Sequence, residues 1–177
     1  MDKIVVTSVI AVAVALIAAF TDFRERRIPN KLTYPATMLA LFVQTLLWGW
    51  KGLLSGLVGG LLFGGIFLLF YIVRAMGGGD VKLATALGCF AGGLASMKLM
   101  FAVAVAGGIL AIIYTLRAKR FMITLRNTLD VIRFHSIFGL QSHPTVNLAN
   151  TESVRMPYGL AFAAGAVYWS LSVSVWR

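Results

Sequence analysis

The chain has 177 residues, of which 59% are hydrophobic and 12% are charged, and its mean hydropathy is +0.87. A water-soluble domain of this length needs more polar surface than these residues supply, so the composition indicates an integral membrane protein. The formal net charge is +10. The basic residues stand between apolar stretches rather than on one continuous face. This pattern argues against nucleic acid as a partner and favours a role in setting membrane topology.

Six apolar stretches come close to the roughly 20 residues that a helix needs to cross a bilayer. They are residues 4–20, 34–50, 53–73, 81–97, 99–116 and 158–176. We interpret the first as a retained helix, because no clean cleavage site ends it before Asp22. The breaks at Lys51-Gly52 and near Lys98 are short, so stretches two and three, and four and five, are expected to form helical hairpins. The predicted fold is all-α, a single domain over residues 1–177 with about six transmembrane helices.

The basic residues fall unequally on the two sides of the predicted membrane. One side has four, namely Lys3, Lys51, Lys98 and Arg177. The other side has twelve, namely Arg24, Arg26, Arg27, Lys31, Arg74, Lys82, Arg117, Lys119, Arg120, Arg126, Arg133 and Arg155. Because loops rich in Lys and Arg stay in the cytoplasm, the second side is expected to be cytoplasmic and both termini to face outward.

One longer cytoplasmic loop is expected over residues 117–156. Its first half has an apolar helical stripe opposite charged residues: Phe121, Leu125, Leu129 and Ile132 against Arg126, Asp130 and Arg133. This pattern fits a helix on an anionic membrane surface and, equally, a helix packed on the bundle. His135 and His143 lie in this loop without an acidic cluster nearby, which disfavours a metal site.

Many glycines inside the stretches indicate close approach between helices, among them Gly56, Gly59, Gly60, Gly64, Gly65, Gly107 and Gly108. Most tyrosines and tryptophans near the ends of the stretches fit an interfacial aromatic belt. The single cysteine, Cys89, can form neither an intrachain disulfide nor a CxxC metal site.

Two of the six carboxylates, Asp22 and Asp80, border apolar stretches on the predicted cytoplasmic side. An ionisable group there is costly enough to suggest a functional site. Two carboxylates that share a site cannot both ionise easily. One can then act as base on a water while the other, protonated, polarises a peptide carbonyl. That is the chemistry of aspartic proteases, which needs no metal or cofactor, and we expect none.

A structural interpretation competes with the catalytic one. Asp80 could cap the N-terminus of the helix that follows Gly77, Gly78 and Gly79. Asp22 could pair at the membrane surface with one of the arginines that follow it. The residue pattern alone leaves the two interpretations evenly matched.

Three segments carry a family resemblance. Residues 22–33, DFRERRIPNKLT, resemble the first signature of the type IV prepilin peptidases, in which Ile-Pro-Asn follows an aspartate. Residues 77–83, GGGDVKL, resemble the second, a G-x-G-D motif followed by a lysine. Residues 156–161, MPYGLA, are similar to a third and less diagnostic element at the start of the last helix. The order and spacing of the three segments extend over nearly the whole chain.

The resemblance implies roles for the matched residues. Asp22 and Asp80 would be the catalytic pair, Gly77 and Gly79 would shape the active-site loop, and Lys82 would tune the carboxylates or contact substrate. An interfacial lysine with no catalytic role is the alternative for Lys82. Pro29 and Asn30 would set the turn into the second helix, and Pro157 would start the sixth.

The resemblance also implies a reaction and a setting. The family removes a short leader from prepilins or pseudopilins at the cytoplasmic face of the bacterial inner membrane. Larger members carry paired CxxC motifs linked to N-methylation, which this chain lacks. We therefore expect no N-methyltransferase activity and a place in the short, peptidase-only Flp/Tad-type branch. The alternatives are a preflagellin-type or other intramembrane protease, or a non-enzymatic pilus assembly subunit or small carrier. No oligomeric state is predicted.

Overall fold

The structure, a computed structural model, describes residues 2–119, 121–138 and 157–175. Within these ranges all regular structure is helical, which confirms the predicted all-α class. The helices are α1 (Lys3–Glu25), α2 (Asn30–Ile72), α3 (Gly78–Ala91), α4 (Ala95–Arg117), α5 (Phe121–Phe138) and α6 (Gly159–Val175). His143, and with it most of the second half of the predicted 117–156 loop, lies outside the described residues.

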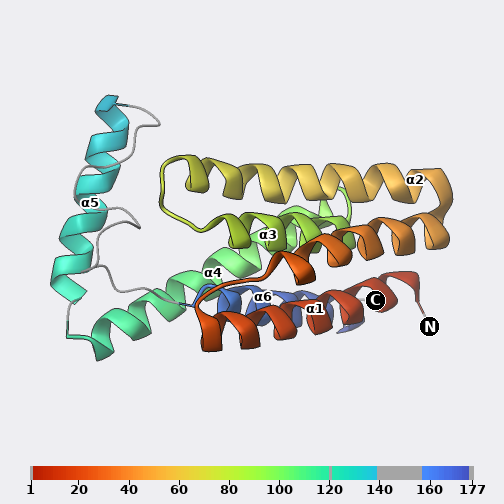
Figure 1. Cartoon of the computed structure of the whole chain (residues 1–177), viewed down its shortest axis with the longest axis horizontal. Helices are drawn as coiled ribbons and strands as arrows, with labels where there is room; N and C mark the ends of the chain where they lie inside the picture. Colours follow the sequence, from red (N-terminus) through yellow and green to blue (C-terminus); the bar gives the residue numbers. More distant parts are fainter. Residues whose placement is uncertain (1, 120, 139–156, 176–177) are drawn as a thin grey trace.

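Helix α2 doubles back on itself, so its two arms lie side by side (Figure 1). The turn is at Gly49, whose φ of 62° and ψ of −146° are not helical. Glycine adopts this positive φ without the steric cost that a Cβ would add. The Nζ of Lys3 donates a hydrogen bond of 2.6 Å to the carbonyl of Leu47 just before the turn. The expected hairpin is therefore present, but its turn precedes the predicted break at Lys51-Gly52.

The second predicted break, near Lys98, is wrong. Helix α3 already ends at Ala91, and Lys98 lies inside α4. Gly92 and Gly93 follow α3 with positive φ values of 71° and 29°, a conformation that favours glycine and ends the helix. The buried Gln44 side chain holds this end, because its Nε2 donates to the carbonyls of Cys89 and Phe90.

Helix α3 is consequently shorter than the predicted fourth stretch. Its 14 residues span about 21 Å, less than the roughly 30 Å of a hydrocarbon core. By length and composition α1, α2 and α4 can cross a membrane, and α6 is apolar but shorter. These helices support a membrane protein, whereas the number of six crossings stays a prediction.

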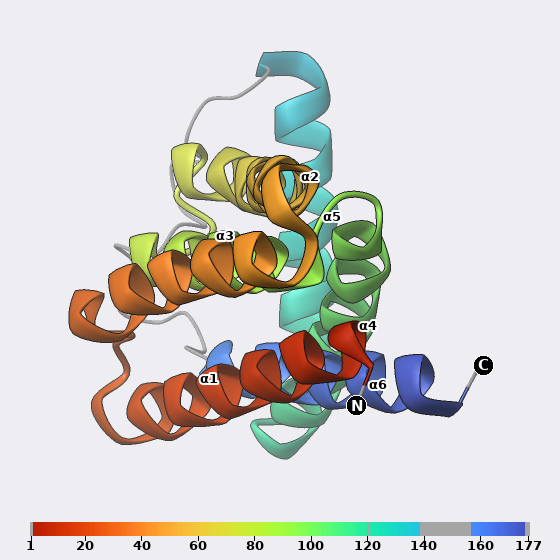
Figure 2. The same ribbon diagram turned by 90° about the vertical axis from the view of Figure 1, so that its right-hand side faces the viewer.

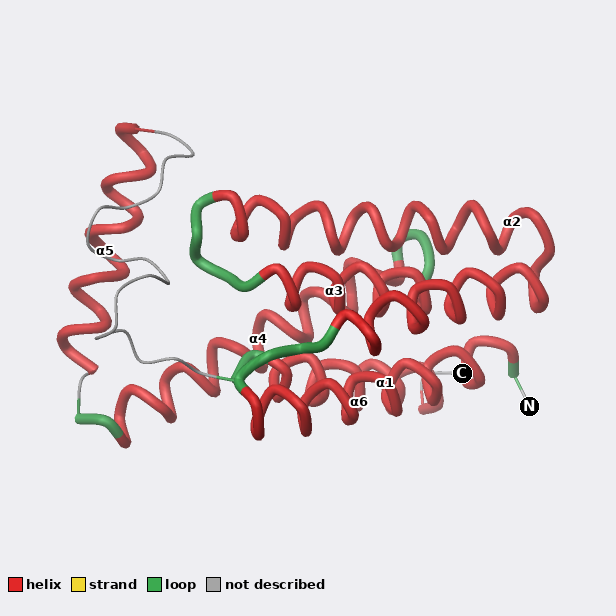
Figure 3. Tube along the Cα trace, in the orientation of Figure 1, coloured by secondary structure: helices red, strands yellow, loops and turns green. Residues whose placement is uncertain are grey.

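The helices other than α5 run roughly along one direction and form the bundle (Figures 1 and 3). Helix α3 packs against α2, and α6 packs against both α1 and α4 (Figure 2). Helix α5 crosses this direction beyond one end of the bundle (Figure 1). Helix α1 ends, and α3 and α6 begin, toward that same end, so the segments that carry the predicted site are gathered there.

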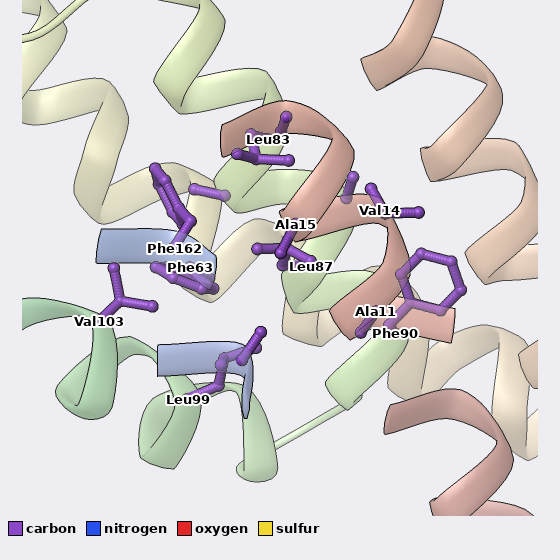
Figure 4. Close-up of a cluster of buried hydrophobic side chains, with 14 of the residues drawn as sticks. Ala11, Val14, Ala15, Phe63, Leu83, Leu87, Phe90, Leu99, Val103 and Phe162 are labelled. Atoms are coloured by element: carbon purple, nitrogen blue, oxygen red, sulfur yellow. The ribbon is translucent and has the colours of Figure 1, made fainter. Parts of the chain in front are cut away.

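Five helices contribute side chains to the buried core (Figure 4). The rings of Phe63 and Phe162, from α2 and α6, have centroids 6.0 Å apart. Leu83 and Leu87 from α3, and Leu99 and Val103 from α4, are fully buried beside alanines of α1. Trp169 is only 2% exposed and belongs to this core, which corrects its assignment to an interfacial aromatic belt.

The glycines in α2 do bring helices together. A Cβ added at Gly59 would overlap the backbone of Gly88 in α3, and one at Gly64 would overlap the side chain of Thr85. Gly65 and Gly108 have no neighbour within 4 Å of an added Cβ, so the predicted close approach is wrong at these two positions.

Candidate active site

Asp22 lies in the last turn of α1 and is directed into the protein, with 7% of its surface exposed. Its Oδ2 accepts a hydrogen bond of 2.7 Å from the backbone N–H of Gly159, the first residue of α6. Negative charge is favourable at a helix N-terminus, where backbone N–H groups lack intrahelical partners. The arginines that follow are exposed, whereas the Asp22 side chain is buried. The burial of Asp22 and its bond to α6 favour an inward role over the proposed pairing at the surface.

Asp80 occupies the first turn of α3. Its Oδ2 accepts a hydrogen bond of 3.1 Å from the N–H of Gly77, and its own N–H donates to the Gly77 carbonyl at 3.1 Å. Gly77 is the N-cap residue, with extended φ and ψ of −80° and 151°. The expected capping role is thus partly correct, since Asp80 supports the helix start from the third helical position. No other hydrogen bond within the described residues engages this carboxylate.

The two carboxylates lie near enough to each other to interact electrostatically. Burial raises the pKa of Asp80, which lies just before the fourth apolar stretch, from 3.8 to about 6. The negative charge of Asp22 raises this pKa further, and the Gly77 N–H opposes the rise. An effect of one charge on the other requires the groups to be near each other in a medium that screens less than water. The end of α1 and the start of α3 therefore place the two aspartates together, 58 positions apart in the sequence.

The two segments that carry the aspartates pack directly on each other. A Cβ at Gly79 would lie 3.1 Å from the Cβ and 3.2 Å from the carbonyl oxygen of Ile28, which is 5% exposed. A Cβ at Gly77 would lie 3.3 Å from Oδ2 of Asp80. The absence of side chains at Gly77 and Gly79 thus lets the loop before α3 fit against the connection between α1 and α2.

Lys82 is held away from the carboxylates. Its Nζ donates a hydrogen bond of 2.8 Å to Oδ1 of Asn30 and lies 4.9 Å from the centre of the Tyr34 ring. Among the residues that the structure describes, no ion pair joins Lys82 to either aspartate. The lysine links the first turn of α3 to the first turns of α2, so its contacts here are structural.

Residues 9–114, more than half of the chain, match the Type IV leader peptidase family. The chain belongs to that family. The matched region contains both aspartates and the loop before α3.

A relative within the leader peptidases is the prepilin peptidase EppA of Methanocaldococcus jannaschii. It is 36% identical over 87 residues, which make up 49% of this chain and 24% of the relative. The match therefore covers about a quarter of that protein's length. No solved structure matches the chain.

The sequence alone does not predict the contact that holds Asp22. Gly159 belongs to the third and less diagnostic family segment. A Cβ at Gly159 would lie 2.9 Å from the Cβ of Asp22 and 3.0 Å from the Cα of Ala19, so α1 and α6 approach closely at this point. The one sequence signal for this contact is Gly159 itself, a glycine two residues after Pro157 at the start of an apolar helix. Tyr158, expected at the interface, instead directs its ring toward Phe67 and Phe162, with centroids 6.3 and 5.9 Å apart.

Proposed function

We propose that this leader peptidase is an aspartic endopeptidase in which Asp22 and Asp80 form the catalytic pair. The observation that carries the proposal is the convergence of the two carboxylates, with the pKa of Asp80 raised to about 6 by burial and by the charge of Asp22. Such a pair holds one proton between its two members over a range of pH. The family membership supports a leader peptidase role in the broad sense.

The proposed reaction uses the two carboxyl groups in different protonation states. Asp22, whose Oδ2 accepts the Gly159 N–H, acts as the base that takes a proton from water. Asp80, the protonated member, donates its proton to the oxygen of the scissile carbonyl. The water oxygen bonds to the carbonyl carbon and gives a tetrahedral diol. Its collapse breaks the C–N bond as Asp22 returns its proton to the leaving amine and a diol hydroxyl reprotonates Asp80, so the starting states are restored.

The proposed substrate is a prepilin or pseudopilin whose short leader ends just before a hydrophobic helix. Gly77, Gly78, Gly79 and Asp80 are each half-buried rather than enclosed, so an extended peptide can approach the Asp80 carboxylate from the exposed side of this loop. We place the site at the cytoplasmic face of the inner membrane, because the basic residues concentrate on that side of the predicted topology. The Flp/Tad-type branch remains our expectation for the pilus system that it serves.

Co-expression with a candidate pilin precursor tests the proposal. The precursor is produced with the unmodified chain or with Asp22→Asn or Asp80→Asn, and its size and new N-terminus are determined by gel and mass spectrometry. Because the pair acts as a unit, either substitution should reduce cleavage by at least about a thousandfold. Glu25→Gln is the matched control, since Glu25 lies one turn beyond Asp22 on the exposed surface and its carboxylate has no assigned role.

The protein level in the membrane fraction must be measured beside cleavage. Loss of processing in both aspartate variants, with normal protein levels and an active Glu25→Gln variant, supports the pair. Cleavage that survives both asparagine substitutions would overturn the aspartic mechanism. A carrier or an assembly subunit would support pilus formation equally well with asparagine at both positions.

A further inference from the structure

A cavity of about 1010 Å³ lies at the end of the bundle opposite the aspartates. Four helices form its walls: the start of α1, the turn region of α2, the start of α4 and the end of α6. The lining residues are Asp2, Lys3, Ile4, Trp48, Met97, Lys98, Phe101, Tyr168, Trp169, Ser172 and Val173. Because Asp22 lies in the last turn of α1 and Gly159 starts α6, the cavity and the candidate active site are a helix length apart.

Two lysines give the cavity its positive charge. Lys98 is exposed and has no ion pair within the described part of the chain. Lys3, which also lines the cavity, is anchored through the hydrogen bond from its Nζ to the carbonyl of Leu47. Asp2 adds one carboxylate, and this residue has an interaction of its own. An anion that entered would meet two ammonium groups on different helices.

The rest of the wall is apolar and aromatic. Phe101 and Tyr168 are 70% and 67% exposed, and Trp48 is 38% exposed. Tryptophan and tyrosine favour the boundary between headgroups and hydrocarbon, and aliphatic side chains such as Val173 accept acyl chains. A soluble anion would leave this apolar surface uncovered, whereas a lipid would cover it.

We propose that this cavity binds one anionic phospholipid, with its phosphate between Lys3 and Lys98 and an acyl chain along Phe101 and Val173. Basic pockets between transmembrane helices receive acidic headgroups on the cytoplasmic side of membranes, and here the same combination of charges and apolar walls lies at the end of the bundle that is predicted to face outward. A bound lipid would connect α1, α2, α4 and α6 at the end of the bundle where α2 turns. This inference concerns a different site from the proposed peptidase and does not depend on it.

Native mass spectrometry of the purified full chain tests the inference. The protein in detergent is titrated with dioleoyl phosphatidylglycerol or dioleoyl phosphatidylcholine, and the apparent affinity of the first bound lipid is measured. We expect one tighter site for phosphatidylglycerol, weakened about fivefold by Lys98→Gln. Lys51→Gln is the matched control, because Lys51 is an exposed lysine near the α2 turn that does not line the cavity. A further arm adds excess glycerol 3-phosphate as a competitor.

The outcomes separate the alternatives. Retention of phosphatidylglycerol that decreases in Lys98→Gln and not in Lys51→Gln supports the site. Equal binding of both lipids, equal loss in both variants or no retained lipid would overturn it. Full competition by glycerol 3-phosphate would also overturn it, because the site would then recognise a soluble anion without the acyl chain.

Discussion

The two aspartates differ in what holds them. Asp22 accepts its hydrogen bond from Gly159, which is 137 positions away and starts another helix. Asp80 accepts its bond from Gly77, three residues earlier in the same loop. The Asp22 carboxylate is therefore held through the packing of α6 against α1, while the orientation of the Asp80 carboxylate at the start of α3 is fixed by a local bond to Gly77. This difference favours Asp22 as the fixed base and Asp80 as the group that carries the proton.

The raised pKa of Asp80 predicts how cleavage depends on pH. Asp80 holds its proton below about pH 6 and loses it above that value. Loss of the proton removes the acid that polarises the carbonyl, so kcat/KM should decrease as the pH rises through about 6. Well above this value the decrease should approach about tenfold per pH unit. The measurement is cleavage of a leader peptide by purified protein between pH 4.5 and 8.5.

Glu25→Gln serves as the control here too and should leave the midpoint unchanged, because Glu25 is exposed at the end of α1. A profile that rises through pH 6 would contradict the assignment of Asp80 as the proton donor. Such a profile would instead require both carboxylates to be ionised in the active form.

At the level of elements, α3 is a short helix whose two ends are tied to α2. Near its start Lys82 bonds to Asn30, and at its end Gln44 bonds to the carbonyls of Cys89 and Phe90. Both partners of α3, Asn30 and Gln44, belong to the first arm of α2. The depth and rotation of α3, and hence the position of Asp80, are therefore set by α2.

The contact between Lys82 and Asn30 distinguishes two roles for the lysine. If Lys82 positions α3, then Lys82→Met and Asn30→Ala should each lower kcat/KM by several-fold to tenfold, because displacement of a catalytic group lowers the rate. The double variant should be no worse than the worse single variant, since both remove the same link. The pH midpoint should be unchanged in all three, as measured with the same cleavage assay.

A direct electrostatic role would give a different result. Lys82→Met would then raise the pH midpoint, because removal of a nearby positive charge favours the neutral carboxyl group. Asn30→Ala would leave the midpoint where it is. Additive losses in the double variant would also contradict the positioning role.

Helix α5 confirms the predicted helix in the first half of the long loop. Leu125 and Leu129 of the predicted apolar stripe are 45% and 49% exposed, so the described residues do not bury these two side chains in the bundle. The helix crosses the bundle direction beyond the end that carries the aspartates (Figure 1). A helix lying along a membrane surface would have such an orientation, and this placement stays a prediction. Contact with anionic lipid stays a prediction.

For the whole molecule, packing depends on the backbone contact between α2 and α3. A Cβ at Gly88 would overlap the carbonyl oxygen of Gly59 and lie 2.9 Å from the Cβ of Phe63. Backbone atoms cannot rotate away from such a clash. The second arm of α2 therefore approaches α3 closely only while both positions are glycine.

Gly88→Ala should destabilise the protein by about 1–3 kcal/mol, the usual cost of overpacking a well-packed interface. The effect is measured as the midpoint of thermal unfolding in detergent. Unfolding is detected by the reactivity of the Cys89 thiol, which is buried in the folded protein. Gly65→Ala is the matched control, because an added Cβ there meets nothing within 4 Å. If both variants unfolded at the same temperature, the Cβ added at Gly88 would be accommodated without loss of stability, and the contact between α2 and α3 would not require glycine there.

Much of the fold followed from short-range signals. The apolar composition determined the membrane class, and the glycines at positions 77–79 marked the boundary at which α3 begins. The same signals misplaced the break after the fourth stretch, because hydropathy continues from α3 into α4 across Gly92 and Gly93. Backbone conformation at two glycines, rather than a charged residue, ends that helix.

By itself, the sequence identified the family and predicted which residues carry the chemistry: Asp22 and Asp80 stand at the ends of apolar stretches, in motifs that resemble the family signatures, and their catalytic role stays a prediction. Only the tertiary structure decided what each side chain contacts. The partner of Asp22 is a backbone N–H from α6, and the partner of Lys82 is Asn30 rather than a carboxylate. The physical reason is range: propensity and hydropathy act over a few residues, whereas these contacts depend on how closely helices remote in the chain can pack.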